Sequence, residues 1–235
     1  MSAYRYEGDE LTLFRGAHRW KAYLRDEIRR EVRGAVLEVG AGLGGTTRAI
    51  RDESDPSWTC LEPDGALCDA LRAEVGALPS PARITVKHGA LSSLDAGARY
   101  DTVLYVDVLE HIADDRAELA RAASHLAPGG ALVVLSPAHP WLFTPFDAAV
   151  GHHRRYTLAA LRALTPAGTA MTRGDYLDAV GLLASLGNRV LLRKAMPTER
   201  QIALWDGVMV PLSRRLDPVL GRRVGKSVLA VWRKG

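Results

Sequence analysis

Cysteine is scarce in this 235-residue sequence, which contains only Cys60 and Cys68. Two cysteines this close together, in a chain without a recognisable secretory leader, predict no disulfide framework and favour the reducing cytoplasm. Long hydrophobic runs are missing too: the most apolar stretches are strand-length or interrupted by Asp, Asn or Arg, whereas a membrane-spanning helix needs roughly 20 apolar residues. No internal repeat or low-complexity linker divides the chain. We therefore expect a soluble, cytoplasmic protein.

What the sequence does contain fits one α/β domain, since 235 residues is the size of one such domain and 47% of them are hydrophobic. Residues 18–33 are typical of an amphipathic helix, because apolar residues recur at four-residue spacing from Trp20 to Val32. Apolar runs of strand length alternate with helical patterns, and this alternation predicts a mostly parallel sheet. The last strand, "KSVLAVWRK", could insert antiparallel in such a sheet. Strands are expected at 35–40, 58–61, 84–86, 102–106, 132–135 and 226–234, with further helices at 64–78 and 114–126.

Positive charge is concentrated in the last part of the sequence. The net charge is +4, yet residues 189–235 contain eleven Lys or Arg and three acidic residues, so the preceding part is net negative. The apolar runs "YLDAVGLLASLGNRVLL" and "ALWDGVMVPL" predict amphipathic helices with basic flanks, which could cover a pocket, form a dimer face or touch an anionic membrane. We expect a helical cap with a solvated basic face, because the segment must return to a final strand. The flanking basic residues are Arg193, Lys194, Arg214, Arg215, Arg222, Arg223 and Lys226.

The segment "VLEVGAGLGG" has the spacing G-x-G-x-x-G through Gly40, Gly42 and Gly45. Such a loop turns tightly and lets the backbone approach a ligand, and Glu62, about 20 residues further on, is placed to accept ribose hydroxyls. Both features serve dinucleotides and other nucleoside cofactors alike. Glu38 separates the two classes, since a buried carboxylate is costly unless a cation or hydrogen-bond donors meet it. A dinucleotide brings negative phosphates there, whereas S-adenosylmethionine brings an ammonium and a sulfonium group.

Four motifs in order resemble the class I S-adenosylmethionine-dependent methyltransferases, in particular the small-molecule branch that includes the ubiquinone and menaquinone enzymes. They are "VLEVGAGLGG", "LEPD", "YDTVLYVDVLEHI" and "LAPGGALVVLSPA", between Val36 and Ala138. The resemblance implies a Rossmann-like α/β fold: a seven-stranded, mostly parallel sheet with the last strand antiparallel and helices on both faces. It implies a single domain over 1–235, made of an N-terminal helical lid (1–33), a cofactor-binding core (34–138), a substrate wall and helical cap (139–226) and the final strand (227–235).

The resemblance also implies a site for S-adenosyl-L-methionine, with Glu38 near its methionine end, the glycine loop around it and Glu62 on the ribose diol. Many relatives carry Gly-Asp after the third strand, and that Asp contacts the adenine amino group. This chain has Ala90 there, so backbone groups around Gly89 to Leu91 would hold the adenine. The residues expected at the cofactor are Trp20, Glu38, Gly40, Ala41, Gly42, Gly44, Glu62, Pro63, Gly89, Ala90, Leu91, Asp107, Val108 and His111.

The segment "PWLFTPFDAAVGHHRRY", from Pro140 to Tyr156, follows the fifth strand, where this fold commonly builds its substrate wall. Its aromatic residues would form an apolar surface, and its histidines and arginines offer a base or an anion clamp. Histidine titrates near neutral pH, so the catalytic candidates are His111, His152 and His153, together with Tyr156. No metal site is predicted, because the spacing of His139, Asp147, His152 and His153 is not diagnostic.

Three functions remain open: a small-molecule O- or N-methyltransferase, a nucleic-acid methyltransferase, and a relative that keeps the cofactor pocket without methylating. The fourth strand ends in "DVLEH" and lacks the Asn/Asp-Pro-Pro-aromatic motif of amino-directed base methyltransferases. No RNA-binding module is recognisable either. We therefore expect a small-molecule acceptor and a monomer or homodimer, although a retained pocket predicts binding and not turnover.

Overall fold

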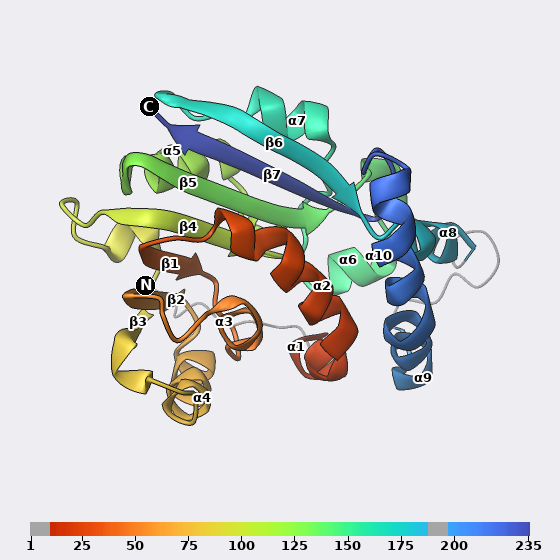
Figure 1. Ribbon diagram of the computed structural model, residues 1–235, viewed down its shortest axis with the longest axis horizontal. Coiled ribbons are helices and arrows are strands. Elements are labelled where there is room, and N and C mark those ends of the chain that lie inside the picture. Colours follow the sequence, from red (N-terminus) through yellow and green to blue (C-terminus); the bar gives the residue numbers. More distant parts are fainter. Residues whose placement is uncertain (1–9, 188–196) are drawn as a thin grey trace.

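One twisted seven-stranded sheet forms the centre of the computed structural model, which describes residues 10–187 and 197–235 (Figure 1). The strand order is β3-β2-β1-β4-β5-β7-β6. Neighbouring strands from β3 to β5 are parallel, and β7 is antiparallel to both β5 and β6. The predicted sheet with an antiparallel last strand is therefore confirmed. The strands are β1 (Ala35–Val39), β2 (Ser57–Glu62), β3 (Ile84–His88), β4 (Tyr100–Val106), β5 (Leu126–Pro137), β6 (Thr169–Leu177) and β7 (Ser227–Lys234).

Helices cover both faces of the sheet, because successive residues of a strand point to opposite sides. In β1, Val36 packs into a hydrophobic cluster on one face and Leu37 into a second cluster on the other. Residues of α2, α3 and α4 contribute to the first cluster, and residues of α5 and α7 contribute to the second. The bounds of these helices are α2 (His18–Ile28), α3 (Gly45–Ile50), α4 (Gly65–Gly76), α5 (Asp115–Ser124) and α7 (Leu158–Ala163).

The order of the strands determines where a ligand can bind. From β1 the chain proceeds to β2 and β3 on one side, and then crosses to β4 and β5 on the other side. The carboxyl ends of β1 and β4 therefore form a switch point, where the connecting loops diverge and leave a crevice. Both motifs with candidate site residues, the glycine loop and "DVLEH", follow these two strands.

Several boundaries differ from the sequence prediction. The helix predicted over 18–33 ends at Ile28, and the strand predicted at 132–135 extends from Leu126 to Pro137. The helix predicted over 114–126 ends at Ser124, and β5 already begins at Leu126. The helix predicted from Tyr176 onward is wrong at its start, since Tyr176 still belongs to β6 and α8 (Ala179–Gly187) begins only after Asp178. Asp178 separates the two elements with a left-handed φ of +67°, and its carboxylate accepts the N–H of Gly181 at 3.0 Å. The rest of the predicted helix, from residue 188, lies outside the described residues.

The segment between β6 and β7 forms the predicted helical insertion, beside the N-terminal helices (Figure 1). Two buried aspartates fasten it. Asp178 accepts hydrogen bonds from Trp205 Nε1 at 2.7 Å and Ser213 Oγ at 2.6 Å. Asp217 accepts one from Tyr23 Oη of α2 at 2.7 Å. Besides α8, the cap contains α9 (Glu199–Leu204), the π-helical segment η8 (Trp205–Met209) and α10 (Val210–Val219).

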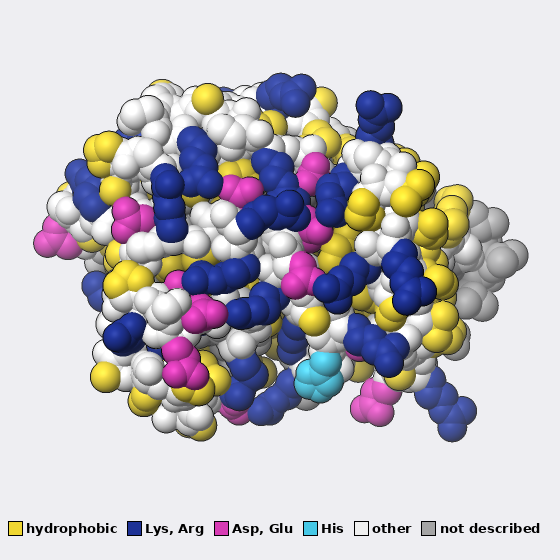
Figure 2. Space-filling model, viewed as in Figure 1, with side chains coloured by type: hydrophobic (Ala, Val, Ile, Leu, Met, Phe, Trp, Pro, Cys, Tyr) yellow, Lys and Arg dark blue, Asp and Glu magenta, His cyan; other side chains and the backbone are white. Residues whose placement is uncertain are grey.

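Basic residues of the C-terminal segment pair with acidic residues near the N-terminus. Arg222 Nη2 lies 2.8 Å from Glu27 Oε1, and Arg233 Nη2 lies 2.7 Å from Glu31 Oε2. Figure 2 shows Lys and Arg side chains spread over this face with acidic side chains between them. The excess of positive charge counted along the sequence is therefore partly neutralised in the fold.

The sequence predicts a basic outer surface for the cap, but the structure also exposes a row of apolar side chains there. Leu204, Val208, Leu212, Leu216 and Leu220 recur at four-residue spacing and are all exposed. Within the described ranges, no helix is both long enough and apolar enough to cross a bilayer. The basic residues at positions 193 and 194 lie outside the described residues.

Candidate active site

The loop after β1 needs its glycines, because its backbone is left-handed at three of them. The φ angle is +67° at Gly40, +54° at Gly42 and +75° at Gly44, values that other residues rarely adopt. A Cβ atom at Gly40 would also lie 2.7 Å from Cγ2 of Val108. The Gly40 N–H donates to the carbonyl of Leu61 in β2 at 2.8 Å, which fixes the loop at the switch point.

Glu38 is buried beneath this loop, with 2% of its surface exposed. Its Oε2 accepts hydrogen bonds from Thr47 Oγ1 at 2.6 Å and Trp58 Nε1 at 2.7 Å. Its Oε1 has no hydrogen bond of normal geometry among the residues described. Burial raises the pKa of Glu38 to about 7, against the opposing effect of hydrogen bonds from the Thr47 hydroxyl, the Trp58 ring and the Thr47 backbone. A cationic group nearby would stabilise the ionised form of this buried carboxyl group.

We expect Glu38→Gln to raise the free energy of unfolding at pH 8, and to do so by less at pH 5. Between about pH 4.5 and 7 the folded state binds more protons at Glu38 than the unfolded state, so wild-type stability falls as pH rises through this window. Glutamine does not ionise and still offers an oxygen to Thr47 and Trp58. Urea unfolding of both proteins at the two pH values measures the effect. An equal difference at both values would contradict it.

Glu62 ends β2 and hydrogen-bonds to the glycine loop. Its Oε2 accepts the Gly42 N–H at 2.8 Å, and its Oε1 accepts the Asp64 N–H at 2.9 Å. Burial raises the pKa of Glu62, while these two backbone hydrogen bonds lower it. Each carboxylate oxygen can accept a second hydrogen bond, so Glu62 is able to receive hydroxyl donors without releasing the loop.

The residues expected around adenine follow β3. The Gly89 N–H donates to the Glu62 carbonyl at 2.9 Å, which places this segment beside the end of β2. Leu91 is buried in the second hydrophobic cluster, and Ala90 offers no polar side-chain atom. Neither this segment nor Pro63 borders the cavity described next.

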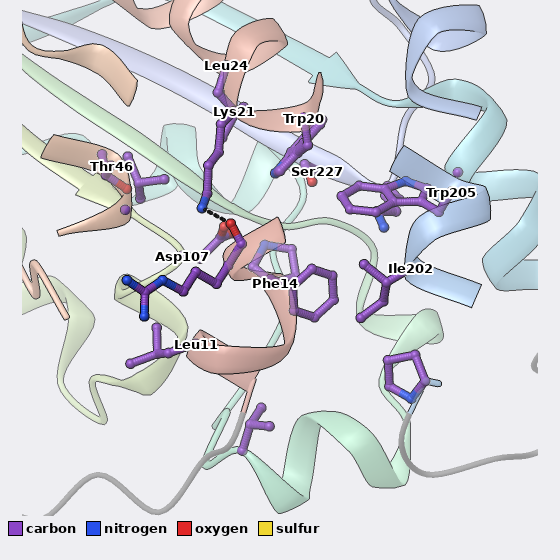
Figure 3. A pocket seen from close by; sticks show the side chains of 18 of the residues that line it. Leu11, Phe14, Trp20, Lys21, Leu24, Thr46, Asp107, Ile202, Trp205 and Ser227 are labelled. Atoms are coloured by element: carbon purple, nitrogen blue, oxygen red, sulfur yellow. Dashed lines mark hydrogen bonds between the residues drawn. The ribbon is translucent and has the colours of Figure 1, made fainter. Parts of the chain in front are cut away.

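A cavity of about 1440 Å³ lies at the switch point. In Figure 3 side chains converge on it from the N-terminal helices, from the sheet and from the cap. The centroids of the Trp20 and Trp205 rings lie 5.5 Å apart. The backbone N–H of Trp20 donates a hydrogen bond to Asp206 Oδ1 at 2.8 Å. The N-terminal helices and the cap therefore meet over the cavity. Residues labelled in Figure 3 include Leu11 of α1 (Glu10–Leu13), Phe14 of η1 (Phe14–Gly16), Trp20 and Lys21 of α2, Asp107, Ile202, Trp205 and Ser227.

Acidic and imidazole groups enter the cavity wall directly after β4. Asp107 has a φ of +54° and precedes the 3-10 turn η5 (Leu109–His111). Asp107 is exposed to the cavity, and the poor solvation of its carboxyl group there raises its pKa to about 6, although electrostatic interactions with His152, Lys226 and Arg155 oppose the rise. Glu110 is fully buried, and burial followed by the neighbouring Asp107 raises its pKa well above the usual range. Burial lowers the pKa of His111 to about 4, so this ring is neutral at pH 7.

His152 reaches the same wall from the loop after α6 (Pro145–Ala149). Its Nδ1 lies 2.9 Å from Asp147 Oδ1, and its ring stands nearly perpendicular to that of His111, with centroids 4.6 Å apart. Asp147 also accepts hydrogen bonds from Arg155 Nε at 2.7 Å and Nη2 at 2.9 Å. Burial opposes ionisation of Asp147, but the hydrogen bonds from His152 and Arg155 hold its pKa below the usual range. The His152 ring is thereby fixed with Nε2 4.0 Å from Glu110 Oε1.

Three further candidates from the sequence do not border the cavity. The His153 side chain is exposed to solvent. Tyr156 is only 2% exposed and donates its hydroxyl to Asp115 Oδ2 at 2.8 Å, within the core. His139 Nε2 pairs with the Gly225 carbonyl at 3.0 Å. We therefore assign these side chains no contact with a ligand.

The comparison with known families connects this geometry to an activity. A family model described as a methyltransferase domain matches residues 37–132, which contain the glycine loop, Glu62 and the segment from Asp107 to His111. The chain carries a methyltransferase domain over these residues.

Solved structures share the fold of this methyltransferase at low sequence identity. A protein described as a sarcosine dimethylglycine methyltransferase from Galdieria sulphuraria is 20% identical, covers 93% of this chain and 84% of its own, and has a TM-score of 0.61. The CcbJ methyltransferase from Streptomyces caelestis is 16% identical, with coverages of 94% and 96% and a TM-score of 0.58. The [4+2]-cyclase SpnF is also 16% identical, with coverages of 91% and 81% and a TM-score of 0.58. A search of curated proteins gave no match.

The expected site residues of the methyltransferase domain differ in whether they reach the cavity. At Gly40 a side chain would collide with Val108, so the backbone there is kept bare on the side of the cavity. Glu38 and Glu62 are both buried beside this loop, and neither of them borders the cavity. Of the expected site residues, those that border the cavity are Trp20, Gly40, Ala41, Gly42, Asp107, His111 and His152.

Some side chains at the methyltransferase site were not assigned roles from the sequence. Asp147 precedes His152 by five residues in a segment without regular periodicity, so nothing in the pattern predicts their hydrogen bond. The sequence indicates only that Trp205 is an apolar residue of the cap. In the structure its ring contacts that of Trp20, which lies 185 positions earlier. Lys226 borders the cavity too, with Nζ 4.0 Å from the centroid of the Trp205 ring.

Proposed function

We propose that this methyltransferase transfers a methyl group from S-adenosyl-L-methionine to an oxygen or nitrogen of a small-molecule acceptor. The observation that carries the proposal is that one cavity borders both the glycine loop after β1 and the acid and histidine groups after β4. Its volume of about 1440 Å³ exceeds the roughly 300–1,000 Å³ of a typical ligand pocket. Cofactor and acceptor therefore have room in one enclosure.

The cofactor end of the site is assigned to the glycine loop and the adjoining strand ends. Glu38 would attract the ammonium group, and Glu62 would accept hydrogen bonds from the ribose hydroxyls while it continues to hold the Gly42 N–H. The bare backbone of the loop allows close approach. The remaining proposed contacts are the residues that border the cavity, Trp20, Gly40, Ala41, Asp107 and His111. The other candidates from the sequence, Gly44, Pro63, Gly89, Ala90, Leu91 and Val108, do not border it.

The acceptor end lies between the aromatic wall and the histidines. S-adenosylmethionine supplies an already activated methyl group, so the protein has to align the nucleophile, exclude water and remove a proton. Phe14, Phe146 and Trp205 provide apolar surface along the cavity. Asp147 occupies Nδ1 of His152, so the lone pair of Nε2 is directed toward Glu110, where it is placed to accept a proton or to bind a cation.

Direct titration tests the cofactor assignment. We expect S-adenosylmethionine and S-adenosylhomocysteine to bind in calorimetric titrations, and NAD to give no heat of binding. Glu62→Ala should weaken both ligands about tenfold or more, because the ribose and the Gly42 N–H lose their acceptor. Asp69→Ala removes an exposed carboxylate that is paired with Arg72 and does not border the cavity, and it serves as the control. Tight NAD binding without a response to the other two ligands would refute the assignment.

Two alternatives make different predictions. The pairing of Arg222 and Arg233 with acidic residues reduces the basic character of this face, which gives little support to a nucleic-acid acceptor. A relative without methyl transfer is the stronger alternative, since the same fold carries a [4+2]-cyclase. A mass-spectrometric screen of small-molecule acceptors with labelled S-adenosylmethionine decides between them. A labelled methyl group in a product supports the proposal, whereas cofactor binding without any methylated product across O- and N-nucleophiles opposes it.

A further inference from the structure

Three side chains with metal-binding atoms gather at one point of the cavity wall. Glu110, His111 and His152 each place one ligand atom so that all three atoms lie within 4.8 Å of one another. The first two follow β4, whereas His152 comes from a loop about forty residues later. A backbone hydrogen bond joins the two segments, because the His153 N–H donates to the Glu110 carbonyl at 2.8 Å. The fold itself therefore brings the three groups together.

Glu110 provides the observation that points to a ligand. Its exposed fraction is 0%, and neither carboxylate oxygen has a hydrogen bond of normal geometry among the described residues. The Ser136 hydroxyl and the Glu110 N–H are close enough only to oppose the rise of its pKa that burial causes. A buried carboxylate paired this weakly is unfavourable. Its nearest basic atom is His152 Nε2 at 4.0 Å, beyond hydrogen-bond length. The space between these atoms is what a bound cation would fill.

The surroundings of His152 resemble those of metal-binding histidines. Metal-bound histidines commonly donate their second ring nitrogen to a carboxylate, which orients the ring and increases its basicity. Asp147 plays this part at Nδ1, at 2.9 Å. Asp147 is itself held by Arg155 and by the Thr144 N–H and hydroxyl at 2.8 and 2.9 Å. The His152 ring is thus fixed before any ligand arrives.

We propose that Glu110, His111 and His152 bind one divalent transition-metal cation at the acceptor end of the cavity. Two imidazoles and one carboxylate suit Zn²⁺, Fe²⁺, Co²⁺ or Mn²⁺, whereas Mg²⁺ and Ca²⁺ prefer oxygen ligands. Three protein ligands leave coordination positions toward the cavity, which Glu110, His111 and His152 all border. This assignment departs from the sequence prediction of no metal site.

The cation would determine how the acceptor is activated, and this step rests on the proposed function. An acceptor hydroxyl bound to the cation loses its proton more readily, and its oxygen then attacks the methyl group as an alkoxide or phenoxide. The proton passes to water, the C–S bond of the sulfonium breaks, and S-adenosylhomocysteine leaves as a neutral thioether. His152 is then a ligand of the cation and not the base, since its Nε2 lone pair serves one purpose at a time.

Cobalt titration tests the metal site without cofactor, acceptor or turnover. The full-length protein is freed of metal with a chelator and titrated with Co²⁺, whose visible absorption reports coordination by nitrogen and oxygen. We expect one equivalent to bind, Zn²⁺ to displace it, and Mg²⁺ in excess to leave it in place. Glu110→Gln and His152→Asn should each weaken Co²⁺ binding about tenfold or more, while His153→Gln, beside the site in sequence but exposed, should not.

Several results would overturn the proposal. No saturable Co²⁺ spectrum in the folded wild type, or equal affinity in wild type and Glu110→Gln, would exclude the assigned ligands. A loss in His153→Gln as large as in His152→Asn would show surface binding only. Circular dichroism and thermal unfolding confirm that each variant is folded. Because S-adenosylmethionine titration is a separate measurement, Co²⁺ binding without cofactor binding refutes the proposed function alone, and the reverse refutes the metal site alone.

Discussion

Asp147→Ala is expected to lower the free energy of unfolding by about 3–5 kcal/mol, the usual cost of removing one partner from a buried ion pair. The Asp147 carboxylate is fully buried and accepts hydrogen bonds from Arg155, His152 and Thr144. Its removal leaves the guanidinium of Arg155, whose side chain is only 14% exposed, without a counter-charge. Urea unfolding at neutral pH measures the loss.

The pH dependence and a double variant separate this ion pair from a simple cavity. The pKa of Asp147 is depressed in the folded state, so its contribution is present above the ordinary carboxyl pKa of about 3.9 and is lost as pH falls below it. Asp147→Ala combined with Arg155→Met should recover part of the stability, because no unpaired charge remains buried. A double variant as unstable as the sum of the two single variants would contradict the ion-pair explanation.

His152→Gln is expected to reduce turnover about a hundredfold or more. This holds whether the His152 ring takes the proton from the substrate hydroxyl or binds a cation that lowers the pKa of that hydroxyl. The affinity for S-adenosylmethionine should change by less than about threefold, because His152 belongs to the acceptor end of the cavity. Product formation is followed by mass spectrometry with the acceptor found in the screen, and cofactor affinity is measured by calorimetry.

His153→Gln is the matched control for this prediction, since the neighbouring ring is exposed and does not border the cavity. It should retain turnover. Equal losses of turnover and of cofactor affinity in His152→Gln would place His152 at the cofactor instead. Addition of Co²⁺ or Zn²⁺ then distinguishes the two uses of the ring: restoration of activity by excess metal supports a ligand, and no restoration supports a base.

Much of the sheet could be predicted because its central strands are short, continuous apolar runs between helices. β1, β2, β4 and β7 are buried on both faces and therefore carry little polar interruption. The sequence does not indicate β6, because "TAMTRGDYL" mixes apolar with polar and charged residues and the strand pairs only with β7 at the edge of the sheet. Such a strand acquires its conformation from its neighbour more than from its own sequence.

The candidate site was predictable only where its residues are near one another in sequence. The turn after β1 is predictable from its glycines, because the left-handed backbone at Gly40 strongly favours glycine. The approach of Glu110 to His152 depends on a backbone hydrogen bond between segments far apart, which no periodicity reports. For Tyr156 the sequence indicates a residue of the substrate wall. In the structure its hydroxyl instead donates a hydrogen bond to Asp115 inside the core.

The contact of Trp20 with Trp205 and Asp206 has a consequence for how the protein is made. Helices such as α2 fold early and locally, but this one has its partners 185 and 186 positions later in the chain. On the ribosome, the glycine loop and its strands emerge long before Trp205 and Asp206 do. Trp20 therefore lacks its contacts with these two residues during most of synthesis. The last-made helices thus complete a binding site whose loop is encoded near the beginning, and a cofactor that binds the closed cavity would stabilise both ends of the nascent fold together.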